Sequence, residues 1–302
     1  MNMDEYFVLF REYMLVQKPS SVNTRDSYLR DVSAFLRYLE GENITSPLEV
    51  ETETVEAYVQ HLHSLNRTNS TISRNIASVL CFYKFLILRG DMQVNPAKSV
   101  KLEKEPKKLP QTLTSEEIDL LLSQPNVTEA KGCRDKAMLE LLYATGIRVS
   151  ELINLNVQDI NLRTGKLFCR GTKGVRTIPI YAKAVVAVSD YLYRMRDLIV
   201  DPDNSGDALF VNLNGSRLTR QGFWKIIKAY TAEAGITKEI TPHTLRHSFA
   251  MHLLQGGASV KDIQTMMGHA DISSTQVYVH LLDLDNHVKS VYNECHPRAK
   301  TS

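Results

Sequence analysis

The stretch KSVKLEKEPKKLPQ, residues 98 to 111, divides the sequence into two parts of different character. It follows Asn95-Pro96, is rich in charge, contains proline and has no apolar periodicity. Such a composition is typical of an extended linker. We therefore expect one domain over residues 1–100, a linker over 101–112 and a second domain over 113–302. At 302 residues the chain is long enough for two domains of ordinary size.

The part before the linker shows helical patterns and almost no strand-like alternation. Apolar residues recur at helical spacing in four segments, which turn signals at Gly41, Pro47 and Gly90 help to separate. The pattern predicts a small domain of four helices.

The part after the linker mixes helical patterns with one strand-like segment. Thr114 and Glu117 have the spacing of a capping box ahead of an apolar run. The segment GKLFCRGTKGVRTIPIY, residues 165 to 181, alternates on both sides of a GTKG turn and predicts a β-hairpin. Helical patterns return over residues 182–199, 219–234, 243–256, 259–267 and 274–293. The second domain is therefore predicted to be mostly helical with one small sheet, which makes the whole chain mainly α.

The composition indicates a soluble cytoplasmic protein. The net charge of +2 argues neither for nor against a nucleic-acid partner, because local basic clusters decide that question. The N-terminus carries acids where a signal peptide carries a basic region, and Lys84 interrupts the longest apolar run, so neither secretion nor membrane insertion is expected. The cysteines show no pairing pattern and are expected to be reduced thiols: Cys81, Cys133, Cys169 and Cys295.

The segment TPHTLRHSF, residues 241 to 249, crowds cationic side chains into the first turns of a predicted helix. His243 and Arg246 lie about 60° apart around such a helix, near the N-terminal end that favours an anion. His243 and His247 have the spacing of a metal-binding pair, but Thr244 stands where the zinc-protease pattern requires Glu, and Arg246 would repel a cation. An anion site, a metal pair and a simple helix cap all remain open at this point.

Two further segments contain isolated polar residues of interest. In ATGIRVSELINL, residues 144 to 155, Glu151 follows Arg148 by one turn and could hold its guanidinium, although an exposed ion pair is the simpler interpretation. In MMGHADISSTQVYVH, residues 266 to 280, His269 follows Gly268 at a predicted helix end, and Tyr278 lies one turn into the next helix. Each of these residues, taken alone, fits ordinary packing or solvation.

In combination and in this order, the motifs resemble the tyrosine recombinase (phage integrase) family. They are G-x-R-x-x-E-L at 146–152, a hairpin lysine, H-x-L-R-H at 243–247, G-H at 268–269 and the later tyrosine. The HPRA near the C-terminus resembles the end of bacterial Xer recombinases. The resemblance implies an N-terminal SAM-like DNA-binding domain of four helices and a mostly helical catalytic domain.

The resemblance also implies catalytic roles. Arg148 and Arg246 match the pair that grips the scissile phosphate, and Tyr278 matches the nucleophile that forms a 3′-phosphotyrosyl bond. Glu151 and His247 would support these residues. Neither a metal nor ATP is expected, because the covalent intermediate conserves the energy of the phosphodiester bond and cationic side chains serve the phosphate.

Three further residues match family positions that move protons or bind the phosphate. Lys173 would protonate the leaving 5′-oxygen, His243 would assist proton transfer at the tyrosine, and His269 would hydrogen-bond the phosphate. The hairpin departs from the usual G-K-G-x-K-E-R pattern by being shorter, and Lys173 is the only lysine in its turn.

The expected partner is double-stranded DNA with a short inverted-repeat site. Candidate DNA contacts are Arg67, Arg74, Lys84, Lys101 and Lys104. The resemblance implies exchange of the C-terminal helix within a homo- or hetero-tetramer and resolution of chromosome dimers at a dif-like site. An FtsK-type translocase is a candidate partner, and the sequence leaves open whether it activates the protein. The alternatives are a mobile-element integrase or transposase, a topoisomerase-like nicking enzyme, a non-catalytic DNA-binding regulator, and a metal hydrolase built on His243 and His247.

Overall fold

The computed structural model describes residues 1–16, 22–102, 110–171, 174–268, 275–279 and 282. The chain forms two compact units, Met1–Lys107 and Lys108–Ser302, and the division between them falls inside the charged stretch at 98–111. Each unit has a hydrophobic core of its own.

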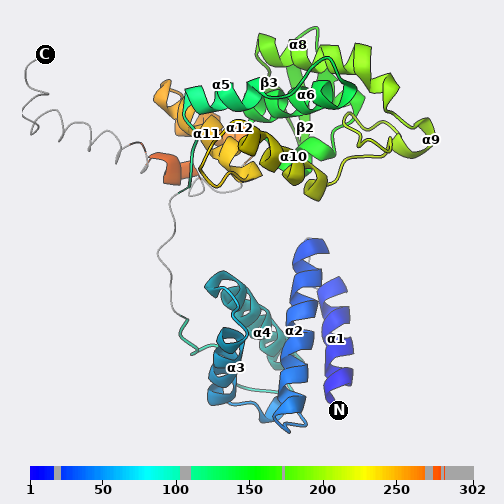
Figure 1. Ribbon diagram of the computed structural model, residues 1–302. Helices are drawn as coiled ribbons and strands as arrows, with labels where there is room; N and C mark the ends of the chain where they lie inside the picture. The colour runs from blue at the N-terminus through cyan, green and yellow to red at the C-terminus, as the bar shows by residue number, and fades with distance from the viewer. Residues whose placement is uncertain (17–21, 103–109, 172–173, 269–274, 280–281, 283–302) are drawn as a thin grey trace, which may run out of the picture. The chain divides into compact units, whose positions relative to one another are not determined.

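The N-terminal unit is a bundle of four helices, as the apolar pattern predicts. They are α1 (Met3–Val16), α2 (Val22–Gly41), α3 (Thr52–Ser64) and α4 (Asn69–Arg89), with a 3-10 turn, η1 (Pro47–Glu49), before α3. In Figure 1, α2 packs against α1 and α4. Thr68 caps α4 by accepting a hydrogen bond from the Thr71 amide, and Gly90 ends the helix at a φ of 83°.

Aromatic side chains fill the centre of this bundle. Phe10 meets Phe82 edge to face with ring centroids 5.3 Å apart, and Phe35 meets Tyr58 in the same way at 5.0 Å. Among the described helices, α4 is long and apolar enough to cross a membrane by length and composition. Because 56% of that window is buried inside the unit, packing in the core accounts for its apolar character.

The C-terminal unit is built around α6 (Ala130–Thr145), which is buried along most of its length. Figure 1 shows α8 (Ala182–Asp190) on one side of α6 and α11 (Pro242–Gln255) on the other. Before α6, α5 (Ser115–Ser123) begins at the predicted capping box, in which the Glu117 amide donates to Thr114 Oγ1 at 3.2 Å and the Thr114 amide donates to Glu117 Oε2 at 2.8 Å.

The sheet contains three antiparallel strands in the order β1 (Ile160–Asn161), β2 (Lys166–Gly171) and β3 (Gly174–Pro179). β2 and β3 form the predicted hairpin, and they pair up to Gly171 and Gly174. Cys169 lies directly opposite Arg176, so both side chains are on the same face. β1 was not predicted, because two residues are too few for a periodic signal.

Two of the remaining helices follow the predicted boundaries, α10 (Arg220–Glu233) and α12 (Val260–Met267). The short helices α7 (Val149–Ile153) and α9 (Pro202–Ser205) were given no boundaries by the sequence analysis. The helix predicted at 182–199 is α8 followed by a π-helical segment, η3 (Tyr191–Met195), and a 3-10 turn, η4 (Arg196–Leu198), with another 3-10 turn, η2 (Val157–Asp159), before β1. Of the helix predicted at 274–293, residues 275–279 are helical, and most of the rest lies outside the described residues.

A buried ion pair connects α6 to the rest of the C-terminal unit. The Arg134 side chain is 3% exposed and that of Asp135 is fully buried, and Arg134 Nη2 lies 2.7 Å from Asp135 Oδ1. Arg134 Nη1 also donates to the Val211 carbonyl at 3.0 Å, and the Tyr230 hydroxyl of α10 donates to Asp135 Oδ2 at 3.0 Å. Removing one partner would leave the other charge buried without compensation.

We predict that Arg134→Met lowers the free energy of unfolding of the C-terminal unit by about 3–5 kcal/mol. Trp224, the single tryptophan of the chain, lies in α10 and reports denaturant unfolding of this unit through its fluorescence. The matched control is Arg194→Gln, which breaks an exposed ion pair with Asp190 and should cost about 0–1 kcal/mol. Equal losses in the two variants would contradict the importance assigned to the buried pair.

Candidate active site

The turn between α6 and α7 brings Arg148 to the surface of the C-terminal unit. Gly146 ends α6 with a φ of 57°, and Arg148 precedes the first residue of α7. A Cβ atom on Gly146 would lie 2.2 Å from Cδ1 of Phe249, so this side chain of α11 packs directly on the turn. Glycine is therefore required here by its conformation and by space.

Arg246 is buried in the interior of the site. It comes from α11, is 4% exposed, and donates through Nη1 to the Gly146 carbonyl and through Nη2 to the Met267 carbonyl at 2.7 Å. Burial lowers the pKa of its guanidinium to about 10, and the nearby charge of Arg148 adds to this effect. Arg246 therefore stays positively charged at neutral pH, inside a low-dielectric environment.

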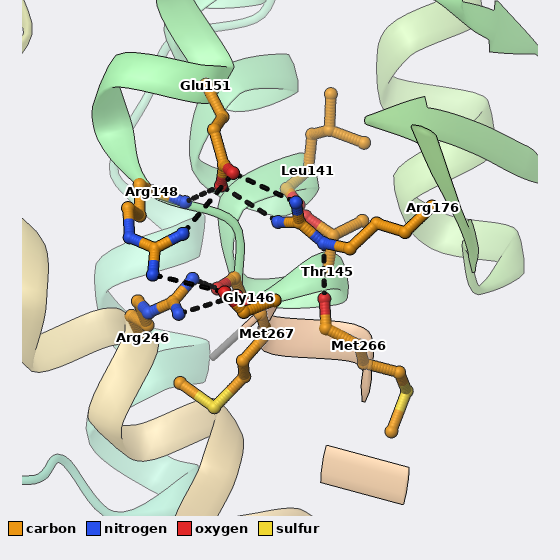
Figure 2. A network of polar contacts seen from close by, with 10 residues as sticks. Leu141, Thr145, Gly146, Arg148, Glu151, Arg176, Arg246, Met266 and Met267 are labelled. Atoms are coloured by element: carbon orange, nitrogen blue, oxygen red, sulfur yellow. Dashed lines mark hydrogen bonds and ion pairs between the residues drawn. The ribbon is translucent and has the colours of Figure 1, made fainter. Parts of the chain in front are cut away.

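Arg148 is more accessible and is held by Glu151. Its amide donates to Glu151 Oε2 at 2.7 Å, its Nη1 lies 3.4 Å from Glu151 Oε1, and its Nη2 donates to the Gly268 carbonyl at 3.3 Å. Figure 2 shows its guanidinium beside that of Arg246, below Glu151. The Glu151 side chain is only 11% exposed. The Arg148–Glu151 ion pair is therefore partly buried, whereas the spacing in the sequence suggested an exposed pair.

Glu151 also binds Arg176, which the sequence analysis did not single out. Both terminal nitrogens of Arg176 donate to the carboxylate at 2.9 Å, and Figure 2 shows the two groups facing each other. Burial raises the pKa of Glu151, but hydrogen bonds from Arg176 and from the Arg148 amide outweigh it, and the pKa lies below its ordinary value. The carboxylate is therefore ionised at neutral pH. A hairpin arginine has no distinctive spacing relative to Glu151, so the sequence offered no local signal for this contact.

Tyr278 is buried with its hydroxyl group bonded to a histidine. It is 2% exposed, it packs with Phe249 and Met267, and its hydroxyl lies 2.6 Å from His247 Nδ1. Burial raises the pKa of Tyr278, while Arg246 opposes the shift, and the side chain is a neutral phenol at neutral pH. The family resemblance assigns proton transfer at the tyrosine to His243, and the structure adds a hydrogen bond between Tyr278 and His247.

His243 and His247 occupy different environments. His243 is exposed in the first turn of α11, next to Pro242, and its ring centroid lies 6.3 Å from that of His247. Burial lowers the pKa of His247 to about 4, with His243 and Arg246 contributing, so His247 is neutral at physiological pH. Within the described part of the chain, no three or more His, Cys, Asp or Glu side chains are grouped to hold a metal ion.

Two predicted catalytic residues, Lys173 and His269, lie outside the described residues, but their neighbours are placed. Gly171 pairs with Gly174, the described residues that flank 172–173 in the sequence, and Gly268 ends α12 with a φ of 63°. A cavity of about 600 Å³ adjoins Arg148 between α7, β2 and Gly268, and Arg170 and Gly171 also line it.

The N-terminal unit contains a separate basic cavity. It has a volume of about 360 Å³ and lies between α2, α3 and α4. Four arginines and one histidine line it: Arg30, Arg37, His61, Arg67 and Arg74. Arg74 is fixed by the buried Asp31 at 2.5 Å, and Arg67 is exposed. Of the other predicted DNA contacts, Lys84 and Lys101 are exposed, and Lys104 lies outside the described residues.

Comparisons with known proteins give matches to both units of the chain. Residues 111–284 match the phage integrase family, and residues 7–90 match the N-terminal SAM-like domain of phage integrases. The tyrosine recombinase XerD of Oceanobacillus iheyensis is 43% identical over 293 residues, which cover 96% of this chain and 97% of that protein. The tyrosine recombinase XerC of Roseiflexus castenholzii is 39% identical over 303 residues, which cover 99% of this chain and 95% of that protein.

The fold is also similar to a solved structure, that of the XerH site-specific recombinase bound to a palindromic difH substrate in a post-cleavage complex. The TM-score is 0.76 at 20% identity, over 89% of this chain and 80% of that one.

The low pKa of His247 predicts a specific dependence of stability on pH. The unfolded chain binds a proton at this histidine near its ordinary pKa of about 6.5, whereas the folded unit resists protonation down to about 4. Its contribution to stability is therefore present above pH 6.5 and is lost as the pH falls from about 6.5 to 4. We predict that His247→Asn, which offers Tyr278 an amide oxygen but cannot titrate, loses less stability than the wild type over this range.

The measurement is the free energy of unfolding from Trp224 fluorescence at several pH values. Groups other than His247 are common to both proteins, so the difference between the two curves isolates this residue. Parallel curves would show that His247 is not buried in the neutral form.

Proposed function

The chain belongs to the phage integrase family and is a site-specific tyrosine recombinase, and we propose that Tyr278 is the nucleophile that cuts and rejoins its DNA. The observation that carries this proposal is the position of the Tyr278 hydroxyl, which lies 2.6 Å from His247 Nδ1. Burial raises the pKa of Tyr278, and the positive charge of the nearby Arg246 opposes that rise. A phenol beside a phosphate-binding guanidinium is suited to attack on a phosphodiester.

Arg148 and Arg246 would bind the two non-bridging oxygens of the scissile phosphate. Arg246 uses two donors on backbone carbonyls and Arg148 uses side-chain donors on Glu151 and Gly268, so each guanidinium is fixed in place before DNA arrives. A guanidinium has five N–H donors, and those left over would serve the phosphate. Charge that develops on these oxygens in the transition state is then stabilised without reorganisation of the site.

The reaction requires two proton transfers. The Tyr278 oxygen forms a bond to phosphorus and loses its proton, and the bond from phosphorus to the 5′-oxygen breaks as that oxygen gains a proton. By family resemblance, Lys173 would donate the second proton, His243 would assist the first transfer, and His269 would bind the phosphate. His247 would hold Tyr278 as a neutral phenol until the DNA is bound.

We propose that neither ATP nor a metal ion takes part. The phosphotyrosyl bond keeps the energy of the phosphodiester, and a 5′-hydroxyl from the partner strand can attack it to complete the exchange. The positive charge that a metal ion would supply at the phosphate is already supplied by two guanidinium groups.

The substrate proposed for this chain is double-stranded DNA with a short inverted-repeat site of the dif type. The XerH recombinase with a similar fold is bound to a difH substrate, and the relatives at about 40% identity are XerD and XerC. We propose chromosome-dimer resolution in the cytoplasm, by a homo- or hetero-tetramer that exchanges the C-terminal helix after Tyr278 between subunits. Activation by an FtsK-type translocase is part of this proposal.

A nicked suicide duplex with the dif-like inverted repeat of the source chromosome tests the chemistry. In EDTA, the wild-type protein should form a covalent DNA adduct that survives denaturing electrophoresis. Tyr278→Phe should form none. The matched control is Tyr193→Phe, which removes the hydroxyl of a side chain that is 73% exposed and should leave the yield of adduct unchanged. An adduct in Tyr278→Phe, or a requirement for a divalent metal, would refute the proposed mechanism.

The basic cavity of the N-terminal unit leads to a second prediction. If Arg67 neutralises a phosphate, Arg67→Gln should weaken binding to any DNA sequence and lower the slope of log affinity against log salt by about one. Gel-shift titrations at several salt concentrations measure this slope. Arg11→Gln in α1 makes the same change of charge away from the cavity and should keep the wild-type slope. Equal slopes for the two variants would show that Arg67 does not neutralise a DNA phosphate.

A further inference from the structure

Arg176 lies at the junction of three elements of the site. It belongs to β3, opposite Cys169 of β2, and its side chain is only 14% exposed. Such burial is unusual for an arginine unless its donors are paired. None of the chemical roles assigned to the family motifs involves this residue, so its burial and its contacts require an explanation.

The contacts of Arg176 fix its guanidinium on two sides. Nη1 and Nη2 each donate to one oxygen of Glu151 at 2.9 Å, and Nε donates to the Met266 carbonyl at 2.8 Å. The first pair is a bidentate bridge to the carboxylate that also holds Arg148. The third bond reaches the last turn of α12, directly before the residue whose carbonyl binds Arg246. One side chain therefore connects the supports of both phosphate-binding arginines.

Two glycines leave the space that this guanidinium occupies. A Cβ atom on Gly268 would lie 2.9 Å from Cζ and Nη1 of Arg176, and one on Gly171 would lie 3.3 Å from Nη1. Gly268 belongs to the G-H motif, and its lack of a side chain is explained both by its positive φ and by the position of Arg176. The packing around this guanidinium thus involves β2, β3, α7 and the end of α12.

We propose that Arg176 is a positioning residue that sets the distance between Arg148 and Arg246 for the scissile phosphate. It acts through Glu151 on one side and through the Met266 carbonyl at the end of α12 on the other, and it does not touch the phosphate. The inference rests on the proposed function, because it assumes that these two arginines bind the phosphate. Reacting groups misplaced by about 1 Å can lose about 100-fold in rate.

The first test compares cleavage with binding on the nicked dif-like duplex. Arg176→Gln should lower the single-turnover rate constant of adduct formation by about 100-fold. Arg176→Lys, which keeps the charge without the planar fork, should lower it by about 10-fold. The Kd for the duplex from gel shifts should stay within about threefold of the wild-type value in both variants. Arg194→Gln, an exposed arginine in η3, is the matched control and should cleave at the wild-type rate.

The pH profile of the cleavage rate distinguishes this positioning role from a purely structural role of Arg176. Among the described residues, the charged and titratable groups that face Glu151 are Arg148, Arg176, Arg246 and the Cys169 thiol. Without Arg176, burial becomes the dominant effect on Glu151 and raises its pKa. As the pH falls, Glu151 is then protonated, and releases Arg148, at a higher pH than in the wild type. The acid limb of the cleavage profile should therefore move to higher pH in Arg176→Gln. A simple loss of folded protein would lower the rate at every pH by the same factor.

A double-mutant cycle tests the route of action. If part of the effect of Arg176 passes through Glu151, the two losses should not multiply: the variant with both Glu151→Gln and Arg176→Gln should cleave faster than the product of the two single losses predicts. If Arg176→Gln does not fold by the Trp224 assay, Arg176→Lys carries the same tests. Wild-type rates in the Arg176 variants, or equal losses of binding and cleavage, would overturn the inference.

The inference and the proposed function can fail separately. If the wild type forms no adduct, the proposed function is wrong, and the ¹³C chemical shift of the Glu151 carboxyl still tests the contact in the DNA-free protein. Arg176→Gln should raise the pKa measured from that shift, and an unchanged pKa would overturn the positioning role. If the wild type forms the adduct and the Arg176 variants do so equally fast, only the inference is wrong.

Discussion

Three guanidinium groups converge on the end of one helix, and the rest of the candidate site depends on how they are held there. The carbonyls of Met266, Met267 and Gly268 accept hydrogen bonds from Arg176, Arg246 and Arg148, in that order. The last carbonyls of an α-helix have no partners within the helix and carry the negative end of its dipole. The end of α12 therefore compensates cations that would otherwise repel one another, and Glu151 provides the carboxylate that binds two of them. Positive charge remains in excess beside the cavity at Arg148, where a phosphate diester can balance it.

This arrangement restricts the backbone at two turns. Gly146 and Gly268 both have positive φ, and a Cβ atom on either would collide with Phe249 or with Arg176, respectively. The α6–α7 turn and the end of α12 are thus held in contact with side chains of the site itself. Phe249, Met267 and Tyr278 belong to one apolar cluster, so the nucleophile proposed here is packed against the same residues that support Arg246. Its hydroxyl is bonded to His247, and burial raises its pKa, so the side chain is a neutral phenol in the DNA-free protein.

Much of the fold could be predicted from the sequence because its signals are local. Apolar periodicity, the Thr114–Glu117 capping box and the change of period at the hairpin each depend on residues a few positions apart, and the structure confirms them. The candidate site was found by a different route, from the order of several short motifs. Local periodicity could not predict that Arg246 is buried, because that depends on carbonyls of Gly146 and Met267 far away in the sequence. It missed Arg176 for the same reason. It also gave no signal for the hydrogen bond between Tyr278 and His247, because the orientation of α11 relative to residues 275–279 is a property of the tertiary fold. The short strand β1 left no periodic signal at all.

The most direct measurement is a crystal structure of the protein with a nicked dif-like duplex and vanadate, which mimics the pentavalent phosphorus of the transition state. The account predicts that Arg148 and Arg246 bind the equatorial oxygens of vanadium while keeping their contacts with the end of α12, and that the Tyr278 oxygen has left His247 to become an apical ligand. A vanadate bound away from these two guanidinium groups, or an apical ligand other than Tyr278, would contradict the account.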